Sequence, residues 1–273
     1  MKDISLYENV PPLKNNFTVK IREYIQYATL IAHWHEHIEL LYFLDGGCEM
    51  LLGGEKFSVE AGDLVVVNSS EVHSFVARGS ARYLCVLIYP AFFSDVDVRG
   101  VRIKSHIQKD DFIRGTFSEM WREARADDAG SDMMLKSYTY GLMAYLVRNF
   151  SVPRLTDEEY VKEARQLKRL ASVMEMINRS YSDRLSTREL AAAAYMTESH
   201  FCRFFKSMTG VSAIRYINDL RVERAAVLLS KTDDPISQIA AAVGFEDVNY
   251  FSRIFRSLRG RSPTEYRKNN KKA

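Results

Sequence analysis

Residues 239–267, IAAAVGFEDVNYFSRIFRSLRGRSPTEYR, combine an alanine-rich segment with a longer amphipathic one. Gly244 predicts a tight turn between the two segments, and Asp247 predicts the N-cap of the helix that follows. The apolar residues of this helix recur at the i, i+3, i+4, i+7 spacing of one buried face: Phe251, Ile254, Phe255 and Leu258. Two short helices joined by a tight turn form a helix-turn-helix, which we predict over 234–260.

The same pattern occurs 50 residues earlier in the chain. A shift by that number aligns the two regions without a gap, and the identical pairs are Ala191 and Ala241, Ala192 and Ala242, Phe201 and Phe251, Arg203 and Arg253, Phe205 and Phe255, Ser207 and Ser257, Gly210 and Gly260, Ser212 and Ser262, and Tyr216 and Tyr266. In this earlier copy, Ser186 and Glu189 have the spacing of a capping box. We therefore predict another helix-turn-helix over 186–210, and one long helix over 212–230 that joins the two units.

In both units, the face of the second helix opposite the apolar one carries polar and basic residues: Ser199, Cys202, Arg203, Lys206, Asn249, Ser252, Arg253 and Arg256. Arginine can bond guanine at two acceptors, and asparagine can bond adenine at one acceptor and one donor. Residues 161–273 contain 21 Lys and Arg against 12 Asp and Glu, whereas residues 1–160 contain 17 against 23. The basic C-terminal half therefore favours a domain that binds double-stranded DNA. The alternative is a helical interaction domain whose arginines are only exposed to solvent.

Residues 165–267 resemble the DNA-binding domain of AraC/XylS-type bacterial transcription regulators, most specifically over 239–267. The resemblance implies that two recognition helices bind promoter DNA in successive major grooves. By motif position it implies base reading by Ser199, Cys202, Arg203, Asn249, Ser252 and Arg253. Other basic side chains suit the phosphates, which position a protein without specifying the sequence: Lys206, Arg256, Arg188 and Arg261.

The first hundred residues contain short β-branched and aromatic runs, such as TVKIREYI at 18–25 and ARYLCVLIY at 81–89. These runs are separated by Gly46-Gly47, Gly53-Gly54 and Gly62-Asp63, which predict turns. Several short strands at such spacing are typical of an antiparallel barrel or sandwich. From about residue 109 the apolar spacing becomes helical.

We therefore predict an α+β chain of two domains. Residues 1–150 form an antiparallel β-barrel with helices, and residues 164–273 form an all-α domain with both helix-turn-helix units. Between them, residues 151–163 contain Pro153 and a run of acids, which predicts a linker. The apolar stripe of residues 131–150 either forms a homodimer surface or packs on its own barrel.

Residues 32–46, AHWHEHIELLYFLDG, place His33, His35, His37 and Glu39 at alternate positions. In a strand all four side chains would project from one face. This segment resembles the first motif of the cupin barrel, a domain that AraC-type regulators often carry for effector sensing. Gly62 and the segment from Asn68 to His73 match the spacing of the second motif, although Asn68, Ser70 and Ala77 replace its usual Pro, Gly and Asn. In metal cupins the ligands would be His33, His35, Glu39 and His73.

Three interpretations of this cluster remain open at the level of sequence. The one we favour is an effector pocket without a cofactor, lined by His33, His35, His37, Glu39 and His73. Alternatively, the cluster binds a divalent transition metal such as Fe, Mn, Ni or Zn, or its residues only satisfy one another. We accordingly expect a transcription regulator, not an enzyme, that responds to a small molecule. A cupin metalloenzyme, an oxygenase or isomerase, fused to a DNA-binding domain is the alternative.

The N-terminal segment MKDISLYENVPP has no apolar region typical of a secretory signal, and apolar runs are too short to span a bilayer. The three cysteines show no CxxC pattern. We therefore expect a protein of the bacterial cytoplasm, associated with the nucleoid and not with a membrane. Its expected partners are promoter DNA, a small-molecule effector and a second copy of the chain, with RNA polymerase as a further candidate.

Overall fold

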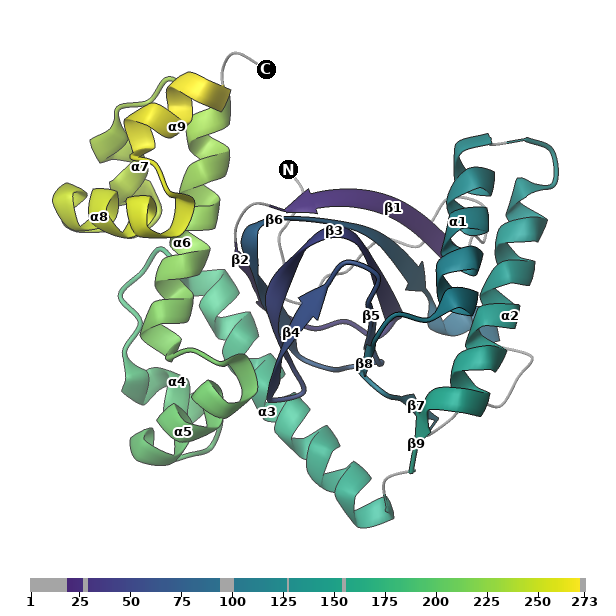
Figure 1. The fold of residues 1–273 in the computed structure, drawn as a ribbon. Helices are drawn as coiled ribbons and strands as arrows, with labels where there is room; N and C mark the ends of the chain where they lie inside the picture. The colour runs from purple at the N-terminus through teal and green to yellow at the C-terminus, as the bar shows by residue number, and fades with distance from the viewer. Residues whose placement is uncertain (1–18, 27–28, 94–100, 127, 154–155, 271–273) are drawn as a thin grey trace. The chain divides into compact units, whose positions relative to one another are not determined.

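The structure, a computed structural model, describes residues 19–26, 29–93, 101–126, 128–153 and 156–270. The chain divides between residues 164 and 165 into an N-terminal β-rich unit and a C-terminal helical unit (Figure 1).

The N-terminal unit contains an antiparallel sheet of seven strands. Its strands are β1 (Val19–Gln26), β2 (Thr29–His33), β3 (Ile38–Leu52), β4 (Glu55–Glu60), β5 (Leu64–Val67), β6 (His73–Ile88) and β8 (His106–Ile107). The order along the sheet is β1-β6-β3-β5-β8, with β2 also paired to β6 and β4 to β3. The two long strands therefore form the centre, and each pairs with different neighbours along its two halves. This exchange of partners lets the strands curl around a common interior, as the purple and blue ribbons of Figure 1 show.

A pair of β-bulges bends the centre of the sheet. The register of β3 against β6 shifts between Phe43 and Asp45 and again between Gly46 and Cys48. The turn predicted at Gly46-Gly47 is therefore wrong, because β3 continues through both glycines. Gly46 has a φ of 70°, and a β-carbon there would lie 1.9 Å from the carbonyl oxygen of Ser80. Glycine is needed because the opposite strand approaches so closely.

Alternate residues of β3, β5 and β6 enter two different apolar clusters. Leu41, Val65 and Leu87 belong to the interior cluster, whereas Leu40, Val66 and Val86 belong to a cluster that includes residues of two helices. These helices are α1 (Asp111–Ala126) and α2 (Ser131–Phe150), which pack beside the sheet (Figure 1). Because both faces of the strands are buried, the sequence there is apolar without alternation.

The residues after α2 depart from the predicted linker. Helix α2 has the bounds expected for the amphipathic helix, 131–150. However, β9 (Ser151–Val152) pairs with β7 (Arg102–Ile103), and helix α3 (Asp157–Ser180) begins before residue 163. Secondary structure therefore occupies most of the interval, while residues 154–155 lie outside the described residues. The carboxylate of Glu159 accepts hydrogen bonds from Thr156, which explains why a run of acids begins a helix here.

The helical unit contains the two predicted helix-turn-helix units. Its helices after α3 are α4 (Thr187–Ala193), α5 (Glu198–Thr209), α6 (Ala213–Lys231), α7 (Ile236–Ala242), α8 (Val248–Arg259) and α9 (Pro263–Asn270). The capping box of Ser186 and Glu189 is formed, and Gly210 and Gly260 end α5 and α8 in the left-handed conformation. On the face of α8 predicted to be buried, Phe251 and Phe255 are fully buried, whereas Ile254 and Leu258 are half-buried. Phe201 and Phe205 at the equivalent positions of α5 are also fully buried. Among the helices of the described residues, none is both long and apolar enough to cross a membrane.

Two glycines of the second helix-turn-helix provide a matched test of this packing. Gly244 and Gly260 both have positive φ, but only at Gly244 would a β-carbon meet another atom, the Ser182 carbonyl oxygen at 2.5 Å. We expect Gly260→Ala to lower the free energy of unfolding by about 1 kcal/mol, and Gly244→Ala by about 3 kcal/mol or more. Thermal unfolding followed by circular dichroism measures both. Equal losses would show that the contact with Ser182 contributes nothing.

Candidate functional site

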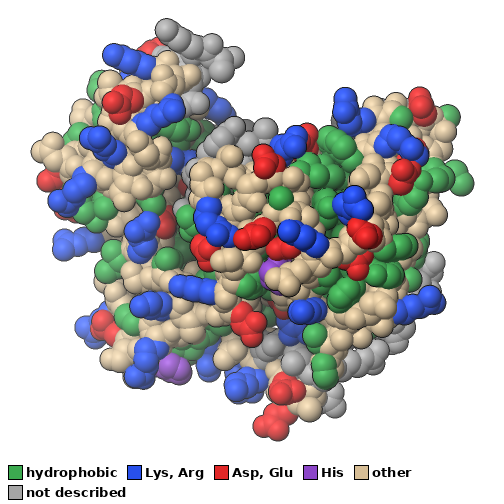
Figure 2. All heavy atoms as spheres, viewed as in Figure 1, with side chains coloured by type: hydrophobic (Ala, Val, Ile, Leu, Met, Phe, Trp, Pro, Cys, Tyr) green, Lys and Arg blue, Asp and Glu red, His purple; other side chains and the backbone are tan. Residues whose placement is uncertain are grey.

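The predicted base-reading residues lie on the solvent-facing sides of α5 and α8. Ser199, Cys202, Arg203, Asn249 and Arg253 are exposed, and Ser252 is half-buried. The opposite sides of both helices pack into the core, which orients the polar sides outward. The residues predicted to contact phosphate are also exposed: Lys206, Arg256, Arg188 and Arg261. The face of the helical unit seen in Figure 2 carries many Lys and Arg side chains among fewer acidic ones.

Local capping fixes where each recognition helix begins. The hydroxyl of Thr197 accepts a hydrogen bond from the amide of His200 in α5. In α8, the carboxylate of Asp247 accepts from the amides of Asn249 and Tyr250 at 2.6 and 3.0 Å. The Asp247 cap was predicted from the sequence, and Thr197 has the same kind of position, a short polar side chain just before the first turn.

A further contact that the sequence did not indicate supports Arg253. Its guanidinium lies over the ring of Tyr250, 5.3 Å from the ring centroid. The hydroxyl of Tyr250 in turn accepts a hydrogen bond of 3.1 Å from Asn218, a buried residue of α6. Helix α6 therefore fixes the ring of Tyr250, which contacts Arg253, the predicted base-reading residue. The i, i+3 spacing of Tyr250 and Arg253 was visible in the sequence, but the partner on α6 was not.

The histidines do not lie on one strand, so the alternation predicted for residues 33–39 is wrong. Strand β2 ends at His33 and β3 begins at Ile38, with irregular backbone between them. Strands β2, β3 and β6, with the connection that contains His35, nevertheless bring four of the five predicted residues together. His73 pairs with His33 of β2 and also with Leu52, at the far end of β3 from Glu39. The curl of the sheet then places His73 Nε2 3.2 Å from Glu39 Oε2.

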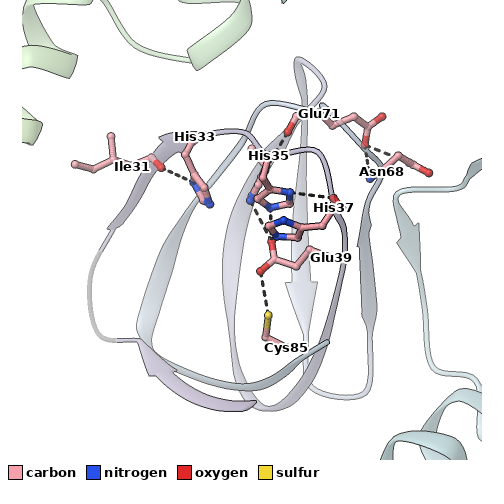
Figure 3. A network of polar contacts seen from close by, with 9 residues as sticks. Ile31, His33, His35, His37, Glu39, Asn68, Glu71 and Cys85 are labelled. Carbon is pink, nitrogen blue, oxygen red and sulfur yellow. Dashed lines mark hydrogen bonds and ion pairs between the residues drawn. The ribbon is translucent and has the colours of Figure 1, made fainter. Parts of the chain in front are cut away.

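Backbone carbonyls orient the imidazoles of the centre (Figure 3). The Nδ1 atoms of His33, His35 and His73 lie 3.0, 3.0 and 3.1 Å from the carbonyl oxygens of Ile31, His37 and Glu71. A carbonyl can only accept, so each Nδ1 carries the proton. In the neutral imidazole, Nε2 then carries a lone pair. Carbonyl partners at the second ring nitrogen are typical of histidines that bind metals.

The electrostatics of the centre favour a cation. Burial lowers the pKa of His33 well below its ordinary value and that of His37 to about 3. Burial of Glu39 opposes ionisation, but the nearby imidazoles of His35 and His73 outweigh it and hold its pKa below the usual range. His35 Nε2 and His73 Nε2 both lie close to the same carboxylate oxygen, at 3.3 and 3.2 Å. A positive charge between these nitrogens and the carboxylate stabilises such an arrangement, whether a proton or a bound cation supplies it.

The donor set fits a divalent transition metal. One nitrogen each from His33, His35 and His73 and one oxygen from Glu39 lie within 4.8 Å of one another. Imidazole nitrogen and carboxylate oxygen are ordinary ligands for Zn, Fe or Ni. In addition, Nε2 of His73 is buried and faces the carboxylate of Glu39 at 3.2 Å, so it lies within the donor group. His37 does not join this group; its ring stacks on His35 with centroids 3.5 Å apart.

The segment before His73 keeps its conformation although Asn68 and Ser70 replace residues usual in the cupin motif. Ser70 adopts a φ of 65°, the left-handed conformation that suits the glycine usual at this cupin position. The side chain of Asn68 donates to the carbonyl of Ile103 and accepts from its amide, at 3.0 and 2.9 Å. These bonds hold the segment in place, so the departures from the motif leave His73 at the centre.

Comparisons with known proteins agree with this division. A cupin domain family matches residues 24–87, and a helix-turn-helix domain family matches residues 190–269. The uncharacterized HTH-type transcriptional regulator YdeC of Bacillus subtilis is 22% identical over 293 aligned residues, which cover 99% of this chain and 100% of YdeC. The MmsAB operon regulatory protein of Pseudomonas aeruginosa is 37% identical over 84 residues, 31% of this chain and 27% of its own length. A crystal structure of ToxT from Vibrio cholerae with a bound unsaturated fatty acid aligns at a TM-score of 0.49 and 15% identity, over 93% of this chain and 96% of that chain.

The two matched families coincide with the two units of the structure. The cupin match begins within β1, at residue 24, and ends at residue 87 of β6, and the helix-turn-helix match includes both recognition helices. Together with relatives that are named transcriptional regulators, these observations agree with the resemblance seen in the repeated motif. The chain is an AraC-type transcription regulator whose N-terminal unit contains a cupin domain.

Proposed function

We propose that the chain binds a specific promoter sequence through α5 and α8, with unequal contributions from the two helices. The observation that carries this proposal is the pair of capped helices with buried aromatic faces and exposed polar faces. Arg253 and Asn249 in α8 can each form two hydrogen bonds with a base, whereas Ser199 and Cys202 in α5 form weaker contacts. Most of the specificity therefore comes from α8 and Arg203. RNA polymerase is a candidate partner of the DNA-bound protein.

Selection of DNA from a random pool by the whole chain tests this proposal, and enrichment of no motif would contradict it. On the selected site, Arg253→Ala should cost about 1–3 kcal/mol and relax the preference at one base pair. Lys206→Ala should instead weaken binding to all sequences and lower the salt dependence of log K by about one. Fluorescence anisotropy on specific and scrambled duplexes measures both. Identical behaviour of the two variants would refute the division into base readers and phosphate contacts.

We further propose that the histidine centre binds a divalent transition-metal ion through His33, His35, His73 and Glu39. The proposal is supported by the protonated Nδ1 atoms, the buried Nε2 of His73 and the compact donor group. When bound, such an ion supplies a Lewis-acidic anchor for the oxygen or nitrogen donors of a small effector. This proposal takes the alternative of a bound metal in place of the cofactor-free effector pocket favoured from the sequence. It keeps the effector pocket itself, with His37 beside the ligands through its stacking on His35.

We assign the centre a sensing role and not a catalytic one. The supporting observation is that the same chain carries two DNA-reading helices, for which a ligand-dependent change in DNA affinity is a sufficient output. The proposal requires that DNA affinity differ between the metal-loaded and the metal-free protein. Equal affinities, together with metal-dependent turnover of a small substrate, would favour the alternative of a cupin enzyme.

Metal binding can be measured on protein produced without a polyhistidine tag and stripped with a chelator. We expect one equivalent of Zn²⁺, Ni²⁺ or Co²⁺ to bind and to stabilise the fold by about 2.7 kcal/mol at a free concentration 100 times Kd. His73→Ala should abolish this binding because it removes a buried donor. His200→Ala, which removes an exposed histidine of α5, is the matched control. Equal metal binding by both variants would exclude the proposed centre.

We also propose that α1 and α2 contribute to a homodimer. Four large hydrophobic side chains of these helices are exposed: Phe112, Met133, Met134 and Tyr140, at 47%, 75%, 42% and 36%. Beside them, an apolar groove of about 440 Å³ lies between the helices, where Gly115 and Gly141 leave open space. A second copy of the hairpin could place its own exposed methionines in such a groove, because methionine adapts to irregular surfaces.

A charge placed on this surface tests the dimer. We expect Met133→Glu to raise the dimer dissociation constant by at least about tenfold, because a buried unpaired carboxylate costs more than 1.4 kcal/mol. Asn149→Glu adds the same charge at an exposed position near the other end of α2 and should have little effect. Analytical ultracentrifugation gives both constants. A wild-type monomer at micromolar concentration would remove the proposal.

A further inference from the structure

Cys85 lies beside the carboxylate of Glu39, on the side away from the imidazoles (Figure 3). Its thiol donates a hydrogen bond of 3.0 Å to Glu39 Oε1, whereas His35 and His73 approach Oε2 at 3.3 and 3.2 Å. The two oxygens of one carboxylate therefore have different partners. The thiol and the carboxylate are both buried, with exposed fractions of 3% for Cys85 and 8% for Glu39.

The register of the central strands places the thiol there. Glu39 pairs with Leu87 of β6, and Leu41 pairs with Cys85. Cys85 is thus the diagonal neighbour of Glu39, two residues along the strand from its direct partner. Leu41, Cys85 and Leu87 all belong to the interior cluster, so their side chains project from the same face of the sheet. The contact depends on main-chain pairing and not on a flexible loop.

We infer that Cys85 is a positioning residue that holds Glu39 as a ligand through Oε2 alone. A carboxylate in a metal site can turn about its last torsion and offer either oxygen or both. The thiol donor fixes Oε1 and so leaves Oε2 directed at the three imidazoles. This inference rests on the proposed binding of a metal ion by the histidine centre.

Cys85 is not itself one of the four grouped donors. The group whose atoms lie within 4.8 Å of one another, among the described residues, consists of His33, His35, Glu39 and His73. Its role is therefore that of an outer partner, whose removal typically weakens metal affinity by about 10- to 100-fold. A cysteine that served only to fill the core would have no such effect.

Cys48 provides a matched control for core filling. It belongs to the same interior cluster as Cys85 and is likewise buried, with an exposed fraction of 0%. Burial raises the pKa of its thiol to about 12, so this cysteine also stays protonated. Its strand partners are Val59 and Ala77, and not a residue of the histidine centre. Truncation at either position removes one buried sulfur from the same core.

The experiment compares Cys85→Ala, Cys85→Ser and Cys48→Ala with the wild type in the whole chain. Competition with a chromophoric chelator gives the affinity for Zn²⁺, and the visible spectrum of bound Co²⁺ reports the ligand geometry. We expect Cys85→Ala to lose about 10- to 100-fold in affinity and to change the Co²⁺ spectrum. Cys85→Ser keeps a donor and should retain both properties, and Cys48→Ala should resemble the wild type.

Two different failures can be told apart. If the wild type binds Zn²⁺ but Cys85→Ala and Cys48→Ala bind it equally well, Cys85 does not position Glu39, and the metal site stands. If the wild type binds no metal, the proposed centre fails and this inference fails with it. Thermal unfolding verifies that each variant folds. Should Cys85→Ala not fold, Cys85→Val removes the donor without opening a cavity and allows the same comparison.

Discussion

The curl of the sheet along β3 and β6 is the constraint on which the N-terminal unit depends. His73 pairs with Leu52, which lies thirteen positions from Glu39 along β3. In a flat strand that separation would span about 43 Å, at about 3.3 Å per residue. The contact between His73 and Glu39 is only 3.2 Å. Only a sheet that bends back on itself, through the bulges near Gly46, can bring these side chains together.

Burial has opposite consequences in the two units. In the cupin domain it lowers the pKa of His33, which disfavours protonation of that imidazole and leaves a lone pair suited to a cation. In the helical unit, burial of one aromatic face leaves the other face of α5 and α8 in solvent, where it can meet DNA. The apolar core therefore creates both candidate sites without contributing to the chemistry of either.

Both sites also depend on contacts just outside the residues that would touch a ligand. Cys85 holds one oxygen of Glu39, and backbone carbonyls fix the imidazole tautomers. In α8, Asn218 holds the hydroxyl of Tyr250, whose ring lies against Arg253. Such contacts restrict the side chains before a partner arrives, which lowers the entropy lost on binding.

The sequence alone determined the duplicated helix-turn-helix, its caps and its exposed faces, because helix spacing and capping depend on residues three or four positions apart. It also indicated four residues of the histidine centre, by resemblance to cupin motifs. Tertiary structure decided how they meet: the expected alternation from His33 to Glu39 does not exist, and Gly46-Gly47 is a bulge within β3. Likewise, the contacts of Cys85 and Asn218 join residues 46 and 32 positions away. Strand register and helix packing are set by burial of the whole core, which no local spacing encodes.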